Sequence, residues 1–190
     1  MVGLILARTL SAIAIEPRRW RLDGTNAADY VSGFDKKTTY SGLPTVRLRS
    51  KISEIQGFGT LLQDVAPMQY QGKGVRFGAA VKTEKLAWWA GLSMRADRVP
   101  GQAPLGFDNM LNPPITGTCD WQTYDLVLYV SQEAQSLFFG VLLVGSGELR
   151  ISDVQIQVVG PNVPVTGEPI DPKRWRRRHP DAWNLDFKVG

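Results

Sequence analysis

Residues 75–95 read VRFGAAVKTEKLAWWAGLSMR, and this stretch decides the fold because apolar residues recur at every second position in two separate runs. The apolar set of the first run is Val75, Phe77, Ala79 and Val81. In the second run one face carries Trp88, Ala90, Leu92 and Met94, and the other carries Trp89, Gly91, Ser93 and Arg95. Successive side chains of a strand point to opposite faces of the sheet. We therefore expect two strands that bury their aliphatic faces and present Trp89 and Arg95 on the opposite face.

Strand signals continue along the rest of the chain. They occur at residues 46–48, 57–63, 124–130 and 137–143, with a short strand expected at 105–107. Gly145-Ser146-Gly147 predicts a tight hairpin connection. In residues 149–158 the apolar positions change parity at Ser152-Asp153, which predicts a β-bulge there.

Composition agrees with an all-β fold. The chain has 190 residues, which suits one domain, and its 19 glycines and 12 prolines favour many turns. Many short strands without intervening helices indicate a sandwich or a barrel. We expect residues 1–44 to form an N-terminal arm and first strands, and residues 45–166 to form the sandwich core. Residues 167–182 are then a basic, proline-containing linker, and residues 183–190 form a closing strand.

Short blocks in a fixed order carry a resemblance to a known family. They are GFGTLLQ at 57–63, YQGKGVRF at 70–77, FDNM at 107–110, ISDV at 151–154 and NLDF at 184–187. This series resembles the galactose-binding-like, carbohydrate-binding-module type of domain that is attached to bacterial AraC-type transcriptional regulators. The resemblance covers roughly Thr45 to Thr166 and the closing block, whereas the region before Thr45 matches poorly. It implies an all-β jelly-roll β-sandwich of two antiparallel sheets, with terminal arms.

The positive charge is concentrated near the end of the chain. Residues 171–190 contain six basic and three acidic residues, which leaves only +1 of the net +4 for the rest of the chain. A nearly neutral body argues against a broad nucleic-acid-binding surface. The pattern also contains no helix-turn-helix, so we expect that nucleic acid is not a partner.

Residues for nucleophilic or metal catalysis are scarce. The single histidine, His179, lies in a charged linker, and the single cysteine, Cys119, lies beside a turn. Neither a catalytic triad nor a zinc cluster can be assembled from them. Paired carboxylates remain an alternative if acids such as Glu84, Asp97, Asp108 and Asp120 meet across a cleft. The prediction is that the protein is not an enzyme.

A polar and aromatic strand face favours binding of a sugar or another small polar ligand. Sugar sites stack aromatic rings on pyranose faces and hold hydroxyl groups with polar side chains. The candidate ligand-binding residues are Trp89, Arg95, Asp108, Asn109, Trp121 and Gln122. The structural alternative is that Trp88 and Trp121 lie in the core, that Arg95 and Asp108 form an ion pair, and that Asp108-Asn109 caps a turn.

A structural calcium ion is the one cofactor that the resemblance allows. Asp153 beside the expected bulge and Asp186 in the closing strand are the candidate metal ligands. Calcium takes six or more oxygen ligands, and the sequence offers these two carboxylates.

Both ends contain apolar segments that need a surface. Val2 to Ile15 is interrupted by Arg8, which favours an ordered strand or helix over a signal peptide, and no stretch is long enough to span a bilayer. Trp183 to Phe187 is too short to stand alone as a strand, so we expect it to add to a sheet edge, and an exchange of arms would give a homodimer. The lone cysteine is consistent with a cytoplasmic protein.

Two functional hypotheses follow. The first is a non-catalytic binding or sensor module for a carbohydrate or a small polar ligand, linked to bacterial transcriptional regulation. The second is a structural or assembly jelly-roll domain that has no small ligand and forms a homo-oligomer. An open groove beside Trp89 and Arg95 would favour the first hypothesis, and burial of these residues under loops together with ion pairing would favour the second.

Overall fold

The computed structural model describes residues 17–99 and 102–167. Several predictions made from the sequence fall on other residues. These are the apolar segment Val2 to Ile15, most of the linker with His179, the closing strand at 183–190 and the metal ligand Asp186. They lie outside the described residues.

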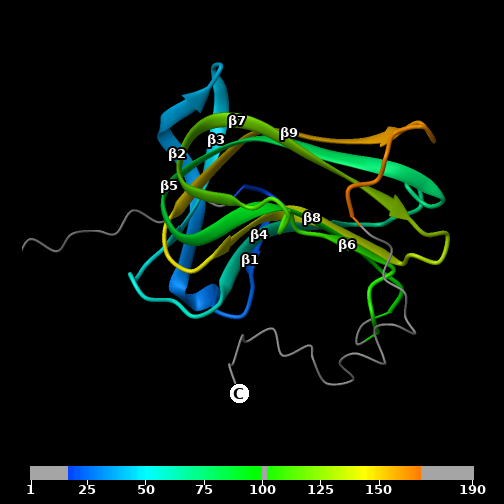
Figure 1. Ribbon diagram of the computed structural model, residues 1–190, viewed down its shortest axis with the longest axis horizontal. Coiled ribbons are helices and arrows are strands. Elements are labelled where there is room, and N and C mark those ends of the chain that lie inside the picture. Colours follow the sequence, from blue (N-terminus) through cyan, green and yellow to red (C-terminus); the bar gives the residue numbers. More distant parts are fainter. Residues whose placement is uncertain (1–16, 100–101, 168–190) are drawn as a thin grey trace, which may run out of the picture.

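The described chain is an all-β sandwich of antiparallel sheets, as the sequence predicted (Figure 1). The strands are β1 (Arg21–Asp23), β2 (Tyr30–Tyr40), β3 (Leu43–Ser50), β4 (Phe58–Val65), β5 (Lys73–Asp97), β6 (Gly106–Asp108), β7 (Ile115–Val130), β8 (Ser136–Val144) and β9 (Glu148–Val159). The one helical element within the described ranges is a 3-10 turn, η1 (Ala27–Asp29). Among these residues no helix has the length and apolar character needed to cross a membrane.

Strand β5 belongs to both layers and connects them. Its first half, from Lys73 to Glu84, pairs with β7 on one side and β9 on the other. Its second half, from Trp89 to Asp97, pairs with β8 and β6. Register shifts between Val81 and Ala90 mark the bend, where Lys85 has a φ of 51°. The two alternating runs of the sequence are therefore the two halves of one bent strand.

This bend defines the two sheets. The first sheet has the order β2-β3-β9-β5-β7, and the second sheet has the order β1-β4-β8-β5-β6. In Figure 1 β7 and β9 lie in the upper layer, whereas β4, β8 and β6 lie in the lower layer. The second sheet carries the candidate site described below.

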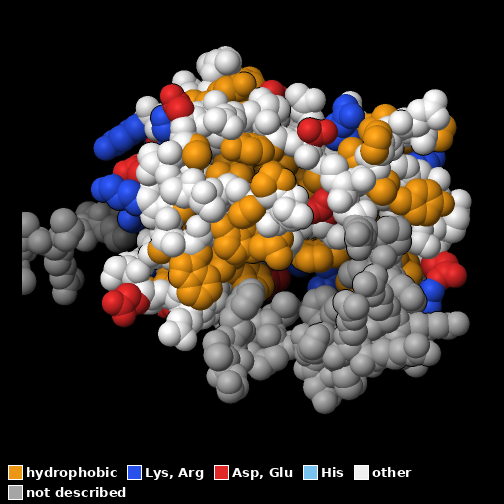
Figure 2. All heavy atoms as spheres, viewed as in Figure 1, with side chains coloured by type: hydrophobic (Ala, Val, Ile, Leu, Met, Phe, Trp, Pro, Cys, Tyr) orange, Lys and Arg blue, Asp and Glu red, His pale blue; other side chains and the backbone are white. Residues whose placement is uncertain are grey.

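The core lies between the two sheets. Its fully buried side chains come from alternate positions, such as Leu92 and Met94 on β5 and Leu137 and Leu143 on β8. Figure 2 shows apolar side chains gathered in a band between the two layers. Each of these side chains contributes about 1.5–3 kcal/mol by leaving water, which is why period-two patterning specifies the face that each strand buries.

The turn at Gly145-Ser146-Gly147 is a connection between sheets, and the prediction of a hairpin was wrong. Strand β8 pairs with β4 and β5, whereas β9 pairs with β3 and β5, so the two consecutive strands lie in different layers. The Gly145 and Gly147 backbones have φ values of 72° and 137°, which only glycine adopts readily. Sequence pattern identifies such a turn but does not distinguish a hairpin from a crossover.

Trp88 is not a core residue, although it shares parity with Ala90, Leu92 and Met94. Its side chain is 49% exposed, whereas Ala90 and Leu92 are fully buried. Trp88 lies where β5 passes from one sheet to the other, and it packs beside Gly145 at the open edge of the sandwich. The bend interrupts the facing sheet at this position, so parity alone misassigns the residue.

The predicted bulge is confirmed. Gly78 pairs with Gln155 and Ala80 with Ser152, so β9 has one more residue than β5 between these pairs. Asp153 adopts a φ of 48°, and its carboxylate accepts a hydrogen bond from the Gln155 side chain at 3.1 Å. The extra residue restores burial of Leu149 and Ile151 on one side of the bulge and of Ile156 on the other.

Candidate functional site

A groove of about 710 Å³ runs along the outer face of the second sheet. Strands β1, β4, β8, β5 and β6 all contribute side chains to it. On β8 it extends from Ser136 to Val144, which corresponds to about 26 Å at about 3.3 Å per residue. A groove of this length and width is a ligand-sized cavity on a rigid scaffold.

The alternation of β5 and β8 supplies most of the groove. On β5, Trp89, Ser93 and Arg95 point outward between the buried residues Ala90, Leu92 and Met94. On β8, Phe138, Gly140 and Leu142 do the same between Leu137 and Leu143. The strand positions that build the core thus also fix the direction of the groove-lining side chains.

The middle of the groove is apolar and aromatic. Trp89, Phe138 and Leu142 come from the two central strands, and Phe58 and Leu62 come from β4 beside them. Gly140 stands between these side chains, where a Cβ atom would come within 2.2 Å of the Leu61 carbonyl oxygen. Glycine at this position lets β4 and β8 approach each other closely and keeps the floor of the groove low.

One end of the groove is polar and is built by β5 and β6. The Arg95 guanidinium pairs with the Asp97 carboxylate at 2.7 Å, and their side chains are 33% and 14% exposed. Asn109 lies at the same end, and its side-chain oxygen accepts a hydrogen bond from the Leu111 backbone amide at 3.2 Å. These groups are held in place by contacts within the protein and face a cavity that can admit a polar ligand.

The opposite end is built by β1 and the turn that follows it. Arg21 pairs with Asp64 and with Asp23, and its guanidinium lies 5.6 Å from the centre of the Phe138 ring. The Asp23 carboxylate accepts a hydrogen bond from the Gly24 amide at 2.7 Å. A guanidinium over an aromatic face orients the ring and adds a cation–π attraction.

Three of the predicted ligand-binding residues lie together in this groove. They are Trp89, Arg95 and Asn109. Asp108 is turned instead toward the Met110 backbone amide, from which its carboxylate accepts a hydrogen bond at 2.9 Å, so the turn-capping alternative is confirmed for Asp108 and Asn109. The alternative ion pair between Arg95 and Asp108 was wrong, because Arg95 has Asp97 as its carboxylate partner two residues further along its own strand.

Trp121 and Gln122 lie away from the groove, on the part of β7 that pairs with the first half of β5. Trp121 packs against Tyr40, with ring centroids 5.1 Å apart, and Gln122 accepts a hydrogen bond from the Tyr124 hydroxyl at 3.1 Å. Gln122 pairs with Val81 in the ladder, and Trp121 precedes it on the same strand, so both belong to the first sheet. The bend in β5 separates them from Trp89 and Arg95.

Sequence analysis missed the part of the groove that comes from β4 and β8. Phe58, Leu62, Phe138 and Leu142 line it, yet an apolar residue in an apolar strand resembles a core residue. A signal was present in β8, where residues 137–144 are apolar at both parities except for Gly140. A strand that is apolar on both faces has a second face to cover, and here that face is the groove.

The groove contains two carboxylates, and they are far apart. Asp23 aligns through Thr60 with Leu142 of β8, whereas Asp97 aligns with Ser136. These positions are six residue steps apart on β8, which corresponds to about 20 Å. Glycosidases place their carboxyl pair about 5–9.5 Å apart.

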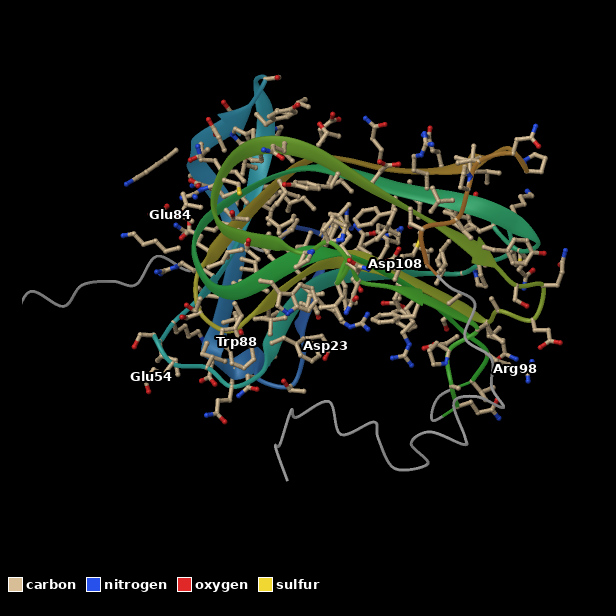
Figure 3. All side chains as sticks on the ribbon, viewed as in Figure 1. Asp23, Glu54, Glu84, Trp88, Arg98 and Asp108 are labelled. Carbon is tan, nitrogen blue, oxygen red and sulfur yellow. The ribbon has the colours of Figure 1, made fainter. Side chains whose placement is uncertain are left out.

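The other acids considered for catalysis also have separate surroundings. Glu84 pairs with Arg150 and Asp120 with Lys82, and both belong to the first-sheet half of the fold. Figure 3 shows Glu84 and Asp108 well separated, and Asp23 well separated from Arg98, the residue after Asp97. The described residues therefore bring no pair of these acids together across the groove.

The calcium prediction remains a prediction, because its second ligand, Asp186, lies outside the described residues. Asp153 itself is exposed on the bulge of β9. Within residues 17–99 and 102–167, no three His, Cys, Asp or Glu side chains gather in a way that could hold a metal ion.

Sequence comparison finds a relative among bacterial regulators. The chain is 34% identical over 148 residues to an uncharacterized HTH-type transcriptional regulator, YbfP, of Bacillus subtilis strain 168. The match covers 77% of this chain and 50% of the regulator, so the chain spans about half the length of this relative. No family model matches the chain.

Structural comparison finds sandwiches of the carbohydrate-binding-module type. The N-terminal xylanase 10B of Clostridium thermocellum, solved as CBM22-1 and GH10 modules complexed with xylohexaose, matches with a TM-score of 0.55 at 11% identity over 81% of this chain and 28% of that one. The CBM22-1 xylan-binding domain of Paenibacillus barcinonensis Xyn10C matches with a TM-score of 0.53 at 13% identity, over 76% and 88%. The enzymatically active domain of tailspike protein 4 from bacteriophage CBA120 matches with a TM-score of 0.54 at 14% identity, over 75% and 20%. At these identities the likeness shows the fold alone, and the expected β-sandwich is confirmed.

Proposed function

We propose that this protein is a non-catalytic sensor module that binds a carbohydrate in the groove of the second sheet. The observation that carries the proposal is the groove itself, which is open along the sheet, has Trp89 on its wall and has fixed polar groups at both ends. An aromatic ring stacks on the face of a sugar ring, while Arg95, Asp97 and Asn109 offer donors and acceptors for hydroxyl groups. The length of the groove favours an oligosaccharide over a single sugar.

The link to transcription rests on the relative with 34% identity, whose name describes an HTH-type regulator. The described residues contain one short 3-10 turn and otherwise strands, so they hold no helix-turn-helix of their own. We propose that the module acts in the cytoplasm beside a DNA-binding part and that sugar binding is the signal it senses. This assignment includes no direct contact with nucleic acid.

Catalysis has less support than binding. The two groove carboxylates are separated by about 20 Å along the strands, and Asp97 is engaged by Arg95 at 2.7 Å. We therefore propose that the groove holds a sugar without cleaving it.

The alternative function, an assembly domain with no small ligand, would place Trp89 and Arg95 under another element. In this structure both line an open groove, although Arg95 is also ion-paired. We therefore rank the assembly function second. A homodimer remains a prediction that sedimentation of the full chain would test.

The test is an isothermal titration calorimetry experiment in which the full chain is titrated with xylo-, cello-, manno- and galacto-oligosaccharides. We expect one class to give a saturable isotherm. Trp89→Ala should then weaken the affinity at least about tenfold, because the stacking surface is lost. Trp121→Ala is the matched control, since it removes the same side chain from the first sheet, and it should leave the affinity unchanged.

Two results would contradict the proposal. If none of these saccharides binds at millimolar concentration, the ligand is not a sugar of these classes. If Trp121→Ala weakens binding as much as Trp89→Ala does, the site is not the groove. Reducing-end analysis after prolonged incubation would separately detect any hydrolysis.

A further inference from the structure

The groove is more apolar than a sugar site requires. Phe58, Leu62, Phe138 and Leu142 line it from β4 and β8, in addition to Trp89, and we call these four residues the strip. In the ladder Leu142 lies opposite Thr60 and Phe138 opposite Asp64, so the apolar side chains meet diagonally, and Leu142 is 6% exposed. A sugar ring uses one or two flat aromatic faces and otherwise presents hydroxyl groups, which aliphatic side chains cannot satisfy. A contiguous apolar strip on an outer sheet face normally has an occupant.

The described chain ends beside β6, the strand that borders the polar end of this groove. After β9 it crosses to β7, where the Thr166 backbone amide donates a hydrogen bond to the Val127 carbonyl at 2.8 Å. At Gly167 an added Cβ atom would meet the Phe107 carbonyl oxygen at 3.0 Å and the Asp108 Cβ atom at 2.7 Å. The third neighbour is the buried Leu128 side chain at 3.0 Å, so Gly167 lies at the edge between the two sheets, next to β6, whose Phe107 side chain lines the groove.

The segment that follows carries the side chains that such a strip would accept. Trp183, Leu185 and Phe187 occupy alternate positions, whereas Asn184, Asp186 and Lys188 occupy the positions between them. An extended segment with this pattern has one apolar face and one polar face. The 15 residues from 168 to 182 can span up to about 50 Å, more than the length of the groove.

We propose that Trp183 to Phe187 of the same chain occupies the groove and that a ligand must displace it. Trp183, Leu185 and Phe187 face Leu62, Phe138 and Leu142 of the strip, and the three polar side chains face solvent. The tail thus acts as an intramolecular competitor at this site. Its occupancy of the groove does not depend on sugar binding, whereas the competition rests on the proposed function.

Paramagnetic NMR on the full chain tests the occupancy directly. In a Cys119→Ser background, a nitroxide is attached through Gln135→Cys, an exposed position next to the groove-lining Ser136. We expect broadening of the amide signals of residues 183–187. A nitroxide attached through Gln157→Cys, an exposed position on the outer face of the first sheet, is the matched control and should leave those signals sharp.

Absence of broadening from position 135 would overturn the proposal. A mixture of spin-labelled unenriched chains with unlabelled ¹⁵N-enriched chains distinguishes a second copy as the occupant. Broadening of residues 183–187 in that mixture would show that the tail docks on a neighbouring molecule, which also overturns it. Sharp signals in the mixture, together with broadening in the single-chain sample, support an intramolecular contact.

A dye-binding experiment tests the same contact without a spin label. The triple variant Trp183→Ser/Leu185→Ser/Phe187→Ser should bind 1-anilinonaphthalene-8-sulfonate at least about fivefold more strongly than the wild type, because it uncovers the strip. Asn184→Ser/Asp186→Ser/Lys188→Ser changes the other face of the same segment and should leave dye binding unchanged. Equal dye binding by all three proteins would count against the tail as occupant. If sugars fail to bind but the tail contact is observed, the occupancy stands and the carbohydrate assignment fails.

Discussion

The outer faces of the two sheets differ sharply, although both belong to the same sandwich. On the first sheet, Arg150 lies 13% exposed among Asp35, Glu84 and Glu148, and Arg47 lies 3.9 Å from Glu148. Nearby, Lys82 pairs with Asp120 at 2.7 Å and Arg76 with Asp125 at 3.0 Å. On the second sheet, the middle of the corresponding face presents Trp89, Phe138, Leu62 and Leu142, and its ion pairs, Arg95–Asp97 and Arg21–Asp64, stand at the two ends.

The difference indicates that the first face contacts solvent and that the second face is suited to contact another molecule or segment. Ion pairs on an outward sheet face keep it soluble and link neighbouring strands, as Arg150 of β9 does by pairing with Asp35 of β2 and Glu84 of β5. Apolar side chains on an outer face have no such role in a monomer, and their exposure to water is unfavourable. Such an exposed patch typically marks a binding surface. We therefore assign a structural role to the outer face of the first sheet and a binding role to the outer face of the second sheet.

The largest effect is expected from breaking the ion network of the first sheet. Arg150→Met should lower the free energy of unfolding by about 3–5 kcal/mol, because it leaves Asp35, 6% exposed, without its partner at 2.8 Å. Denaturant titration measures the loss. The double variant Asp35→Asn/Arg150→Met should recover part of it, since no buried charge is then left unpaired. A loss below about 1 kcal/mol in the single variant would show that the network is dispensable.

Acid should weaken the same face. Burial by itself raises the pKa of Asp35, but hydrogen bonds from Arg150, Lys37 and Thr38 outweigh it and lower this pKa to about 2. A depressed folded-state pKa stabilises the protein above the unfolded value near 4, and the contribution is lost as the pH falls toward 2. The difference in unfolding free energy between wild type and Asp35→Asn should therefore shrink by about 2 kcal/mol from pH 6 to pH 2. A constant difference would contradict the assigned pKa.

The sequence predicts much of this arrangement, for reasons that particular residues make clear. Alternation at residues 75–81 and 87–95 predicted both halves of β5, with Trp88 the misassigned position, and the change of parity at Ser152-Asp153 predicted the bulge. Alternation also placed Trp89 and Arg95 on an outward face. These features are local, because each depends on neighbours a few residues away.

The remaining features depend on contacts between distant parts of the chain. The sequence from Thr83 to Ala87 contains no pattern that predicts the bend of β5 from one sheet into the other. This bend exposes Trp88 and separates Trp121 from Trp89. The turn at Gly145 has the composition of a hairpin, but the pairing of β8 and β9 with other strands makes it a crossover. The groove residues of β4 and β8 were not predicted from the sequence, because outward-facing apolar residues have the same residue types as core residues.

The smallest effect is expected at Leu62, on the groove face, and a neighbouring residue provides the comparison. Leu61 is fully buried, whereas Leu62 is half-buried and lines the groove. Leu61→Ala should cost about 2–5 kcal/mol in unfolding free energy, because it opens a cavity in the core.

Leu62→Ala should cost less than about 1 kcal/mol in a chain whose tail carries Trp183→Ser/Leu185→Ser/Phe187→Ser, since the side chain is then open to water. In the wild-type background the same change should cost more, because an occupying tail removes Leu62 from water. Denaturant titration of five proteins (the wild type, Leu61→Ala, Leu62→Ala, the tail variant and the tail variant with Leu62→Ala) measures these costs. Equal costs of Leu62→Ala in the two backgrounds would show that the groove is uncovered in solution. A cost of Leu62→Ala in the tail variant as large as the cost of Leu61→Ala would show that the groove face is part of the core.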